Sequence, residues 1–270
     1  ALGAALVVWH KELDKSRTIS KIDSMKGAFL GPKYNQEEIE NSLLKCGAKF
    51  ESLDDDSIIK TTAKALVEGK AVGWFQGRME FGPRALGARS IIADPRSEKM
   101  QKILNLKVKY RESFRPFAPS VLREDLNEWF DFDYDSPYML LVSEVKKNIR
   151  YDLNEEEKKL FGIDKLNIKR SKIPAVTHVD YSARVQTVHK DTNPKYHSLI
   201  SSFKEITGCP VIVNTSFNVR GEPIVCTPTD AFKCFMGTEL DVLVIGNCFL
   251  FKEQQNIKLS EDYKRKFKIV

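Results

Sequence analysis

The chain has 270 residues, of which 42% are hydrophobic and 30% are charged, an ordinary balance for a globular protein in water. No apolar run approaches the about 20 residues that a membrane-spanning helix requires, which excludes helical membrane spans. The formal net charge of +6 fits a nucleic-acid-binding protein, and it fits equally an enzyme that acts on ATP or another phosphate compound. A chain of this length forms one large domain or two small ones.

The five cysteines are scattered and include no Cys-x-x-Cys pair, which is typical of reduced thiols, so we expect a cytoplasmic location. The four histidines have no metal-ligand spacing, and we therefore predict no protein-built metal site. Because the chain begins with Ala and shows no leader before a cleavage site, we expect it to be a piece of a longer protein.

The N-terminal residues 1–9 are helix-forming and apolar on nearly every side, a pattern that predicts a buried helix. The polar residues 11–26 that follow are typical of a linker. Asn35 and Glu38 then form a capping-box pattern before a helix that ends at Gly47.

The acidic triplet at residues 54–56 precedes a helix over residues 57–68, which Gly69 ends. Three carboxylates in a row are compatible with a metal cluster or with a helix cap. We favour the cap, because the triplet stands directly before a helical period, where carboxylates complement the helix dipole.

The chain is organised around residues 77–96, where four arginines alternate with three glycines between two apolar, strand-like runs. Glycine lets backbone N–H groups approach a ligand closely, and the planar fork of arginine matches phosphate oxygens. We favour an anion pocket over a solvated basic loop, because Pro83 and the glycines restrict the path of the chain. The arginines and glycines are Gly77, Arg78, Gly82, Arg84, Gly87, Arg89 and Arg96.

Helices and short strands alternate along the rest of the chain, which predicts an α/β fold with a mixed twisted sheet covered by helices. Residues 148–170 are highly charged without a clear period and are typical of a peripheral insertion with solvated basic charges. We expect helices over residues 98–106, 124–130 and 195–207 and after Pro228, and strands over residues 117–122, 139–145, 176–179, 184–188, 211–213, 242–245 and 249–251.

Three long motifs carry a family resemblance: Glu-Phe-Gly-Pro-Arg-Ala-Leu-Gly at residues 80–87, Phe-Arg-Pro-Phe-Ala-Pro-Ser at 114–120, and Asn-Thr-Ser-Phe-Asn-Val-Arg-Gly-Glu-Pro-Ile-Val at 214–225. They resemble the C-terminal, YrdC-like domain of the O-carbamoyltransferases, which include nodulation and antibiotic-tailoring enzymes. The resemblance covers roughly residues 25 to 252, which implies a YrdC-like fold for that part of the chain.

The resemblance also implies a division of the chain into three parts. Residues 1–25 would be the tail of a preceding actin-like (Kae1-like) domain together with a linker, residues 26–252 the YrdC-like domain, and residues 253–270 a basic C-terminal tail. The histidines that bind metal in the preceding domain would lie outside this sequence.

In the family, a Lys and an Arg at the spacing of Lys109 and Arg115 bind the phosphates of ATP and carbamoyl phosphate. The resemblance therefore implies that both are catalytic, since cations stabilise charge on the reacting phosphates. The alternative interpretation is a surface salt-bridge strip with Glu112. The motif at residues 178–188 implies a further catalytic ligand, Arg184, although many members have Gly where this chain has Tyr181.

Ser216 and Asn218 follow a buried strand and place a hydroxyl and an amide on one side of the chain. By resemblance they line the adenylate pocket together with Arg220; the alternative is a local Asx or Ser turn. Arg78, Arg84 and Arg89 are implied as further ligands for ATP or carbamoyl phosphate, and Arg84 and Arg89 as guides for the intermediate. Ala88 stands where Asn is common in the family, so a polar contact to substrate is absent or replaced.

The resemblance implies that ATP, accompanied by Mg²⁺ as its substrate complex, reacts with carbamoyl phosphate to give carbamoyl-adenylate. A preceding domain would then transfer the carbamoyl group to a hydroxyl of a sugar or natural product. The alternative is a YrdC-like domain that binds RNA or modifies transfer RNA. We favour the enzyme and expect no nucleic-acid partner, because the cations cluster with Gly and Pro rather than in an open stripe with aromatic residues.

Overall fold

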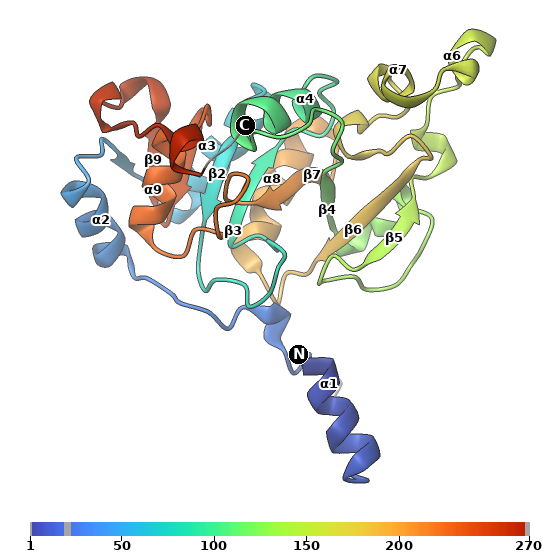
Figure 1. The fold of residues 1–270 in the computed structure, drawn as a ribbon, viewed down its shortest axis with the longest axis horizontal. Helices are drawn as coiled ribbons and strands as arrows, with labels where there is room; N and C mark the ends of the chain where they lie inside the picture. The colour runs from blue at the N-terminus through green and yellow to red at the C-terminus, as the bar shows by residue number, and fades with distance from the viewer. Residues whose placement is uncertain (1, 19–22, 268–270) are drawn as a thin grey trace.

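The computed structural model describes residues 2–18 and 23–267. Within these residues, nine strands form one mixed sheet (Figure 1) in the order β1-β9-β8-β2-β3-β7-β4-β6-β5. Their bounds are β1 Glu51–Ser52, β2 Val72–Phe75, β3 Arg89–Ala93, β4 Ala118–Leu122, β5 Leu141–Glu144, β6 Ser182–Val188, β7 Val211–Ser216, β8 Val242–Ile245 and β9 Cys248–Phe251. β2 and β8 are parallel, as are β4 and β6, and the other neighbours are antiparallel. The predicted mixed α/β fold is confirmed.

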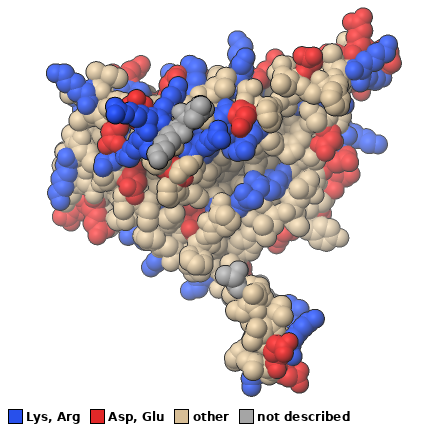
Figure 2. Space-filling view, viewed as in Figure 1, with Lys and Arg blue, Asp and Glu red and all other residues tan. Residues whose placement is uncertain are grey.

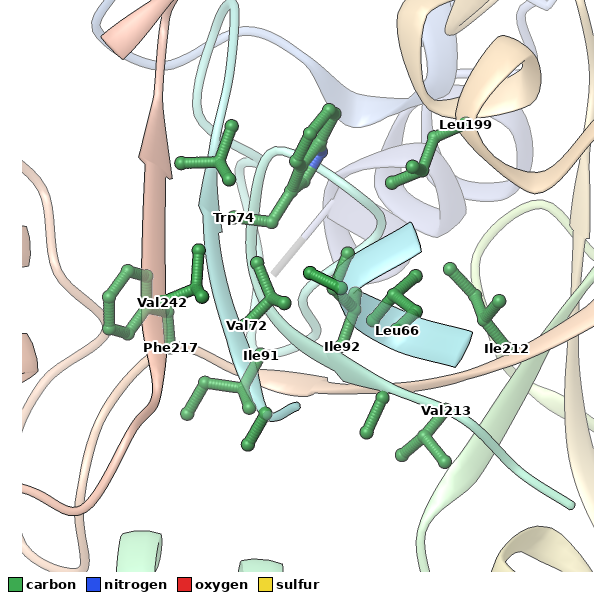
Figure 3. Close-up of a cluster of buried hydrophobic side chains, with 14 of the residues drawn as sticks. Leu66, Val72, Trp74, Ile91, Ile92, Leu199, Ile212, Val213, Phe217 and Val242 are labelled. Atoms are coloured by element: carbon green, nitrogen blue, oxygen red, sulfur yellow. The ribbon is translucent and has the colours of Figure 1, made fainter. Parts of the chain in front are cut away.

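Four longer helices pack on this sheet: α2 (Gln36–Lys45), α3 (Asp55–Val67), α8 (Pro194–Thr207) and α9 (Pro228–Met236). The shorter ones are α1 Leu2–Val7, α4 Met100–Ile103, α5 Leu126–Trp129, α6 Glu155–Lys159, α7 Gly162–Asn167 and α10 Tyr263–Lys266. Figure 3 shows Leu66 of α3 and Leu199 of α8 beside Val72, Trp74 and Ile212 of the sheet. These apolar side chains are fully buried and fix α3 and α8 on the sheet.

Local cap signals set the starts of three of these helices. The side chain of Asn35 accepts a hydrogen bond from the Glu38 N–H, and the Glu38 carboxylate accepts one from the Asn35 N–H, as predicted. Asp54 accepts from the Ser57 N–H at 2.8 Å and so caps α3, which explains the acidic triplet. Thr227 caps α9 through the Asp230 N–H.

The N-terminal helix is exposed in this chain, so the predicted burial is not observed within it. Helical structure spans Leu2–Val7 and continues as a π-helical turn over Val8–Glu12. It projects from the body of the molecule (Figure 1). Half of the Trp9 surface and 45% of the Leu6 surface are exposed. Ala1 and part of the predicted linker, residues 19–22, lie outside the described residues.

The charged insertion projects at the edge of the sheet, where α6 and α7 extend away from the core (Figure 1). The expectation of solvated basic charges is wrong for Arg170, which is 1% exposed. Its guanidinium donates to five backbone carbonyls, those of Lys165, Leu166, Ile168, Thr177 and His178. The predicted strand at residues 176–179 is also wrong, because the chain forms a 3-10 turn at Pro174–Val176.

The basic C-terminal segment is not a free tail in the described residues. The short helix α10 returns to the body of the molecule, and Tyr263 at its start belongs to the hydrophobic core with 3% exposure. Residues 268–270 of the predicted tail lie outside the described residues.

Candidate phosphate-binding site

Lys109 lies at the end of a π-helical turn, Leu104–Val108, and its side chain crosses to the end of β7. Its Nζ donates to the backbone carbonyls of Ser216 and Asn218, at 2.7 and 2.8 Å, and lies 2.7 Å from Asn218 Oδ1 and 3.2 Å from Ser216 Oγ. The structure thus brings together three predicted site residues from two motifs that are about a hundred residues apart in sequence.

The surroundings of Lys109 act on its charge in opposite directions. The residue is only 3% exposed, and burial lowers its pKa to about 7, with a further contribution from the Arg111 cation. The four oxygen contacts favour the ammonium form, because the ammonium group has three N–H donors and the neutral amine has two. Lys109 therefore changes between its charged and neutral forms close to neutral pH.

Ser216 and Asn218 contact each other as well as Lys109. The Ser216 hydroxyl donates to Asn218 Oδ1 at 2.7 Å, and the Asn218 amide donates to the Glu222 carbonyl at 2.6 Å. The Ser216 and Asn218 side chains thus contact each other locally and also hold Lys109 in place.

Arg115 is exposed and forms an ion pair with Glu112, with 3.3 Å between Arg115 Nε and the carboxylate. The salt-bridge alternative is therefore observed for Arg115, and such exposed pairs contribute little to stability. The pKa of Glu112 is lowered by a backbone N–H and by the nearby cations of Arg115, Arg220 and Arg111. These three arginines thus gather around one carboxylate at the mouth of the Lys109 cluster.

Sequence reasoning missed Arg111 and its partner Asn105. Arg111 Nε donates to Asn105 Oδ1 at 2.7 Å, and the fully buried Asn105 amide donates to the carbonyls of Ser113 and Arg115. Burial lowers the pKa of Arg111 to about 10, with a contribution from the Arg115 cation. Asn105 therefore fixes the loop that carries Arg115. The sequence signal that could have revealed Arg111 is that it is a third cation between Lys109 and Arg115.

The Gly-rich loop is held from inside by Arg89, whose side chain is fully buried. Its guanidinium donates to the carbonyls of Gln76, Ala88 and Pro32 at 2.9 to 3.2 Å, and to Gly77 at 3.3 and 3.4 Å. It also stacks 3.5 Å from the centre of the Phe75 ring. These contacts give Arg89 a part in shaping the loop and leave it no exposed surface.

A buried carboxylate that sequence reasoning missed holds the other side of this loop. Glu80 is 5% exposed, and its Oε1 accepts from the backbone N–H groups of Leu86, Ala88 and Arg89 at 2.6, 2.7 and 3.2 Å. Gly87 has a φ of +101°, and a Cβ there would lie 2.3 Å from the Tyr196 ring. The interpretation as a merely solvated loop is therefore wrong for its second half.

Of the remaining arginines, Arg78 and Arg84 are exposed, whereas Arg96 is partly buried and ion-paired with Asp94 at 2.6 Å. Arg78 donates to the Gly31 carbonyl at 3.1 Å, and Arg84 lies near Arg184 on β6. Burial lowers the pKa of Arg184, and the Arg84 cation lowers it further, while no carboxylate of the described residues opposes this. The buried Arg184 Nε has no hydrogen-bond partner. Two like charges side by side with a free donor are suited to an anion.

A cavity of about 160 Å³ lies beside the loop that carries Arg115. Phe114 and Pro116, which flank Arg115, form one wall, and His178 forms part of the other. Burial lowers the pKa of His178, and the cations of Arg184 and Arg170 lower it further despite Asp180. The cavity therefore lies between the loop of Arg115 and residues 175–179, which precede β6. Figure 2 shows Lys and Arg side chains gathered beside a hollow on this face of the molecule.

Both departures from the family motifs leave the local structure intact. Tyr181 adopts a φ of +64°, a conformation that favours glycine, and the Arg150 guanidinium stacks 4.6 Å from its ring centre. Ala88 is 2% exposed, and its N–H donates to Glu80, so its methyl group is packed inside the loop.

Comparison with known proteins places this chain in a family. Residues 63–252 match the family model described as the carbamoyltransferase C-terminus. The chain is 56% identical over 257 residues to an uncharacterized protein of Synechocystis sp., covering 94% of this chain and 42% of that protein. It is 38% identical to the nodulation protein NolNO of Sinorhizobium fredii, covering 98% of this chain and 36% of that protein. The chain belongs to the carbamoyltransferase family.

A further relative is the 3'-hydroxymethylcephem-O-carbamoyltransferase of Streptomyces clavuligerus, 36% identical over 74% of this chain and 34% of that protein. The chain thus spans about two fifths or less of the length of these relatives. Among the described residues, no helix is long and apolar enough to cross a membrane. Those residues also hold no group of three or more His, Cys, Asp or Glu side chains placed to bind a metal ion.

Proposed function

We propose that this chain forms carbamoyl-adenylate from ATP and carbamoyl phosphate. For the atoms to balance, carbamoyl phosphate first gives its phosphoryl group to water and releases carbamate and phosphate. A carbamate oxygen then bonds to the α-phosphorus of ATP, and the bond to the β-phosphate breaks with release of pyrophosphate. Both steps bring anions together, and cations that reduce their repulsion lower the barrier.

The observation that carries this proposal is the Lys109 cluster at the end of β7. One buried ammonium group joins Ser216 and Asn218, and the exposed Arg115 and Arg220 lie at its mouth. The proposal assigns Arg115 and Arg220 to the phosphates and gives Lys109 the charge behind them. Ser216 and Asn218 hold that charge in place, and the Ser216 hydroxyl and the Asn218 amide donate to Asn218 Oδ1 and to the Glu222 carbonyl.

We assign the second group of cations, Arg84 and Arg184, to the other anion. Their proximity and the unpartnered Arg184 Nε support this assignment. Arg78 is exposed at the rim of the same loop and completes the proposed binding set. In this proposal the buried Arg89 positions the loop instead of contacting phosphate. Mg²⁺ enters with ATP, held mainly by phosphates and water.

The whole protein would then transfer the carbamoyl group from the adenylate to a hydroxyl acceptor. The similarity to an O-carbamoyltransferase and the short span of the chain on its relatives support this part of the proposal. We place the acceptor chemistry in a preceding actin-like domain. This chain alone should therefore stop at carbamoyl-adenylate and carbamoylate no hydroxyl.

The test is pyrophosphate release from ATP and Mg²⁺, measured with and without carbamoyl phosphate. Release should depend on carbamoyl phosphate, and Arg115→Ala should lower the rate about tenfold to a hundredfold, the value of a hydrogen bond to a charged group. Arg123→Ala is the matched control, because Arg123 is ion-paired with Asp133 away from the cluster. Equal rates in Arg115→Ala and the control would remove Arg115 from the site.

A thermal shift separates this proposal from RNA binding. A ligand that binds the folded chain raises its melting temperature through RT ln(1 + [L]/Kd). Millimolar ATP with Mg²⁺ should raise the melting temperature, whereas duplex RNA should leave it unchanged. A shift with duplex RNA and none with ATP would replace the proposed enzyme with an RNA-binding domain.

A further inference from the structure

The C-terminal segment, residues 257–267, packs beside the Lys109 cluster through Tyr263. The ring of Tyr263 fills the space above Gly237 so closely that a Cβ on that glycine would lie 2.1 Å from it. Tyr263 and Phe267 also pack edge to face, with ring centres 5.1 Å apart. The segment is therefore attached by an aromatic anchor and not by its basic charges.

The hydroxyl of Tyr263 faces the half-buried carboxylate of Glu222. Glu222 Oε2 also accepts from the Val219 N–H at 2.8 Å and from the Cys234 thiol at 3.3 Å. Burial raises the pKa of Glu222, and the contacts to Val219, Cys234 and Tyr263 oppose that rise. The Tyr263 hydroxyl thus belongs to the small set of groups that favour the charged carboxylate.

Glu222 connects this contact to the cluster at the end of β7. Its carbonyl accepts from the Asn218 amide at 2.6 Å, and Asn218 Oδ1 accepts from Lys109 Nζ at 2.7 Å. Tyr263 lowers the pKa of the Glu222 side chain, and the carbonyl of the same residue is hydrogen-bonded to Asn218, which contacts Lys109. A change at Tyr263 therefore reaches the cluster through the single loop that carries Asn218 and Glu222.

The same segment also contacts the second loop of the site. Lys264 Nζ lies 4.9 Å from the centre of the Tyr110 ring, and the Tyr110 hydroxyl donates to the Gly237 carbonyl at 3.0 Å. Tyr110 stands between Lys109 and Arg111 and has a φ of +47°, which is strained for a residue with a side chain. The segment therefore holds the loop of Lys109 from one side and the loop of Asn218 from the other.

We propose that residues 257–267 act as a clamp, in which Tyr263 and Glu222 are positioning residues for the phosphate site. The clamp fixes the loop from Ser216 to Glu222 against Lys109, so that this loop keeps the geometry that the anion meets. This inference rests on the function proposed above. Neither residue contacts the substrate in this scheme, and both act through Asn218 and Lys109.

The first experiment needs no substrate. Amide hydrogen exchange is measured at Val219, whose N–H donates to Glu222, in the full chain and in Tyr263→Phe. The variant keeps the ring over Gly237 and removes only the hydroxyl. Exchange at Val219 should become about tenfold faster, the size of effect that one hydrogen bond produces. Exchange within twofold of the wild type would overturn the clamp.

A matched control separates positioning from general loss of stability. Ile58→Val removes one buried methyl group from α3, far in sequence from the clamp, and costs about 0.5–1.5 kcal/mol by destabilising the core. Ile58→Val should leave the exchange rate of Val219 unchanged relative to other loops. Equal acceleration in both variants would show that Tyr263 merely stabilises the fold and would overturn the proposal.

The second experiment measures pyrophosphate release. Tyr263→Phe should raise the KM for ATP about threefold to tenfold and change kcat less, because the loop is loosened in the free protein and reordered by the bound phosphates. Glu222→Gln should act similarly, and the double variant should resemble the worse single variant, because both changes break one path. Additive effects, or an unchanged KM, would overturn the clamp.

Failure of the wild type to release pyrophosphate would count against the proposed function. The exchange rate at Val219 would still decide whether the clamp exists, because that measurement needs no substrate.

Discussion

The base of the candidate site and its exposed rim both carry cations, and they use them differently. At the base, Arg89 and Lys109 are almost fully buried, and the terminal nitrogens of both side chains donate to oxygens of the protein. At the rim, Arg84, Arg115 and Arg220 are exposed to solvent. A buried charge is costly unless it is hydrogen-bonded, so the base cations are tied to the fold, while the rim cations stay available to a ligand.

This difference teaches that a cation in a Gly-rich motif is not by itself a ligand. Arg84 and Arg89 stand five residues apart in one motif, but only Arg84 reaches the surface. Arg89 shapes the loop that presents Arg84, because its guanidinium binds the carbonyls of Gln76 and Ala88. The predictions below test this division between positioning and binding.

The largest effect should come from Arg89→Met, which leaves the carbonyls of Gln76, Ala88 and Pro32 without their buried donor. The free energy of unfolding should fall by about 3–5 kcal/mol, because each buried carbonyl left without a donor costs about 1–3 kcal/mol. Arg84→Met should change it by less than about 0.5 kcal/mol, because Arg84 is exposed. Urea unfolding of both variants measures the contrast, and similar losses of stability would erase the distinction between base and rim.

Lys109→Ala should have the largest effect on activity, because it removes the charge behind the phosphates and leaves the oxygens of Ser216 and Asn218 unpaired. Losing one preorganised electrostatic contact costs about 2.7–4 kcal/mol, or roughly a hundredfold to a thousandfold in rate. Lys107→Ala is the matched control, since Lys107 is exposed and paired with Glu239. Carbamoyl-phosphate-dependent pyrophosphate release near the wild-type rate in Lys109→Ala would contradict the assignment of this lysine.

The fold was largely predictable because its signals are local. The caps at Asn35 and Asp54 and the glycine after α8 mark helix ends by themselves. The wrong predictions concern segments whose packing depends on residues distant in sequence, or for which the described chain provides no packing partner. The N-terminal helix is apolar but meets nothing in the described chain, and Arg170 is buried only because five carbonyls converge on it.

The motifs predicted residues that come together in the structure, whereas the division of the candidate site into a buried base and an exposed rim could not be predicted from them. The motifs named Lys109, Ser216 and Asn218, which do meet at the end of β7. They did not reveal Glu80 or Glu222, because a carboxylate that accepts backbone N–H groups has the same sequence appearance as a solvated one. Whether a charged side chain is buried depends on how the whole sheet packs. The motifs alone therefore do not distinguish the buried base of the site from its exposed rim.

A smaller effect should come from pH, because burial lowers the pKa of Lys109 to about 7. The ammonium form attracts phosphate, so a rise in pH through that pKa removes the attracting charge from the free protein. The affinity for ATP should therefore fall between pH 7 and pH 9, by about tenfold or more if binding requires that proton. Calorimetric titration of wild type and Lys109→Arg measures this, since arginine stays charged over the range. The same pH dependence in both proteins would assign the titration to another group.

The smallest effect should come from Ser216→Ala, which removes the contacts of one hydroxyl with Lys109 Nζ and Asn218 Oδ1 and leaves Lys109 Nζ with three oxygens of Ser216 and Asn218. Such a hydrogen bond is worth about 0.5–1.5 kcal/mol, so pyrophosphate release should slow about twofold to tenfold. Ser198→Ala on the exposed side of α8 is the control and should change nothing. If Ser216→Ala instead matched Lys109→Ala, the hydroxyl would belong to the reacting groups and not to the support of the cation. The base of the site would then also touch substrate, and the division between base and rim would fail.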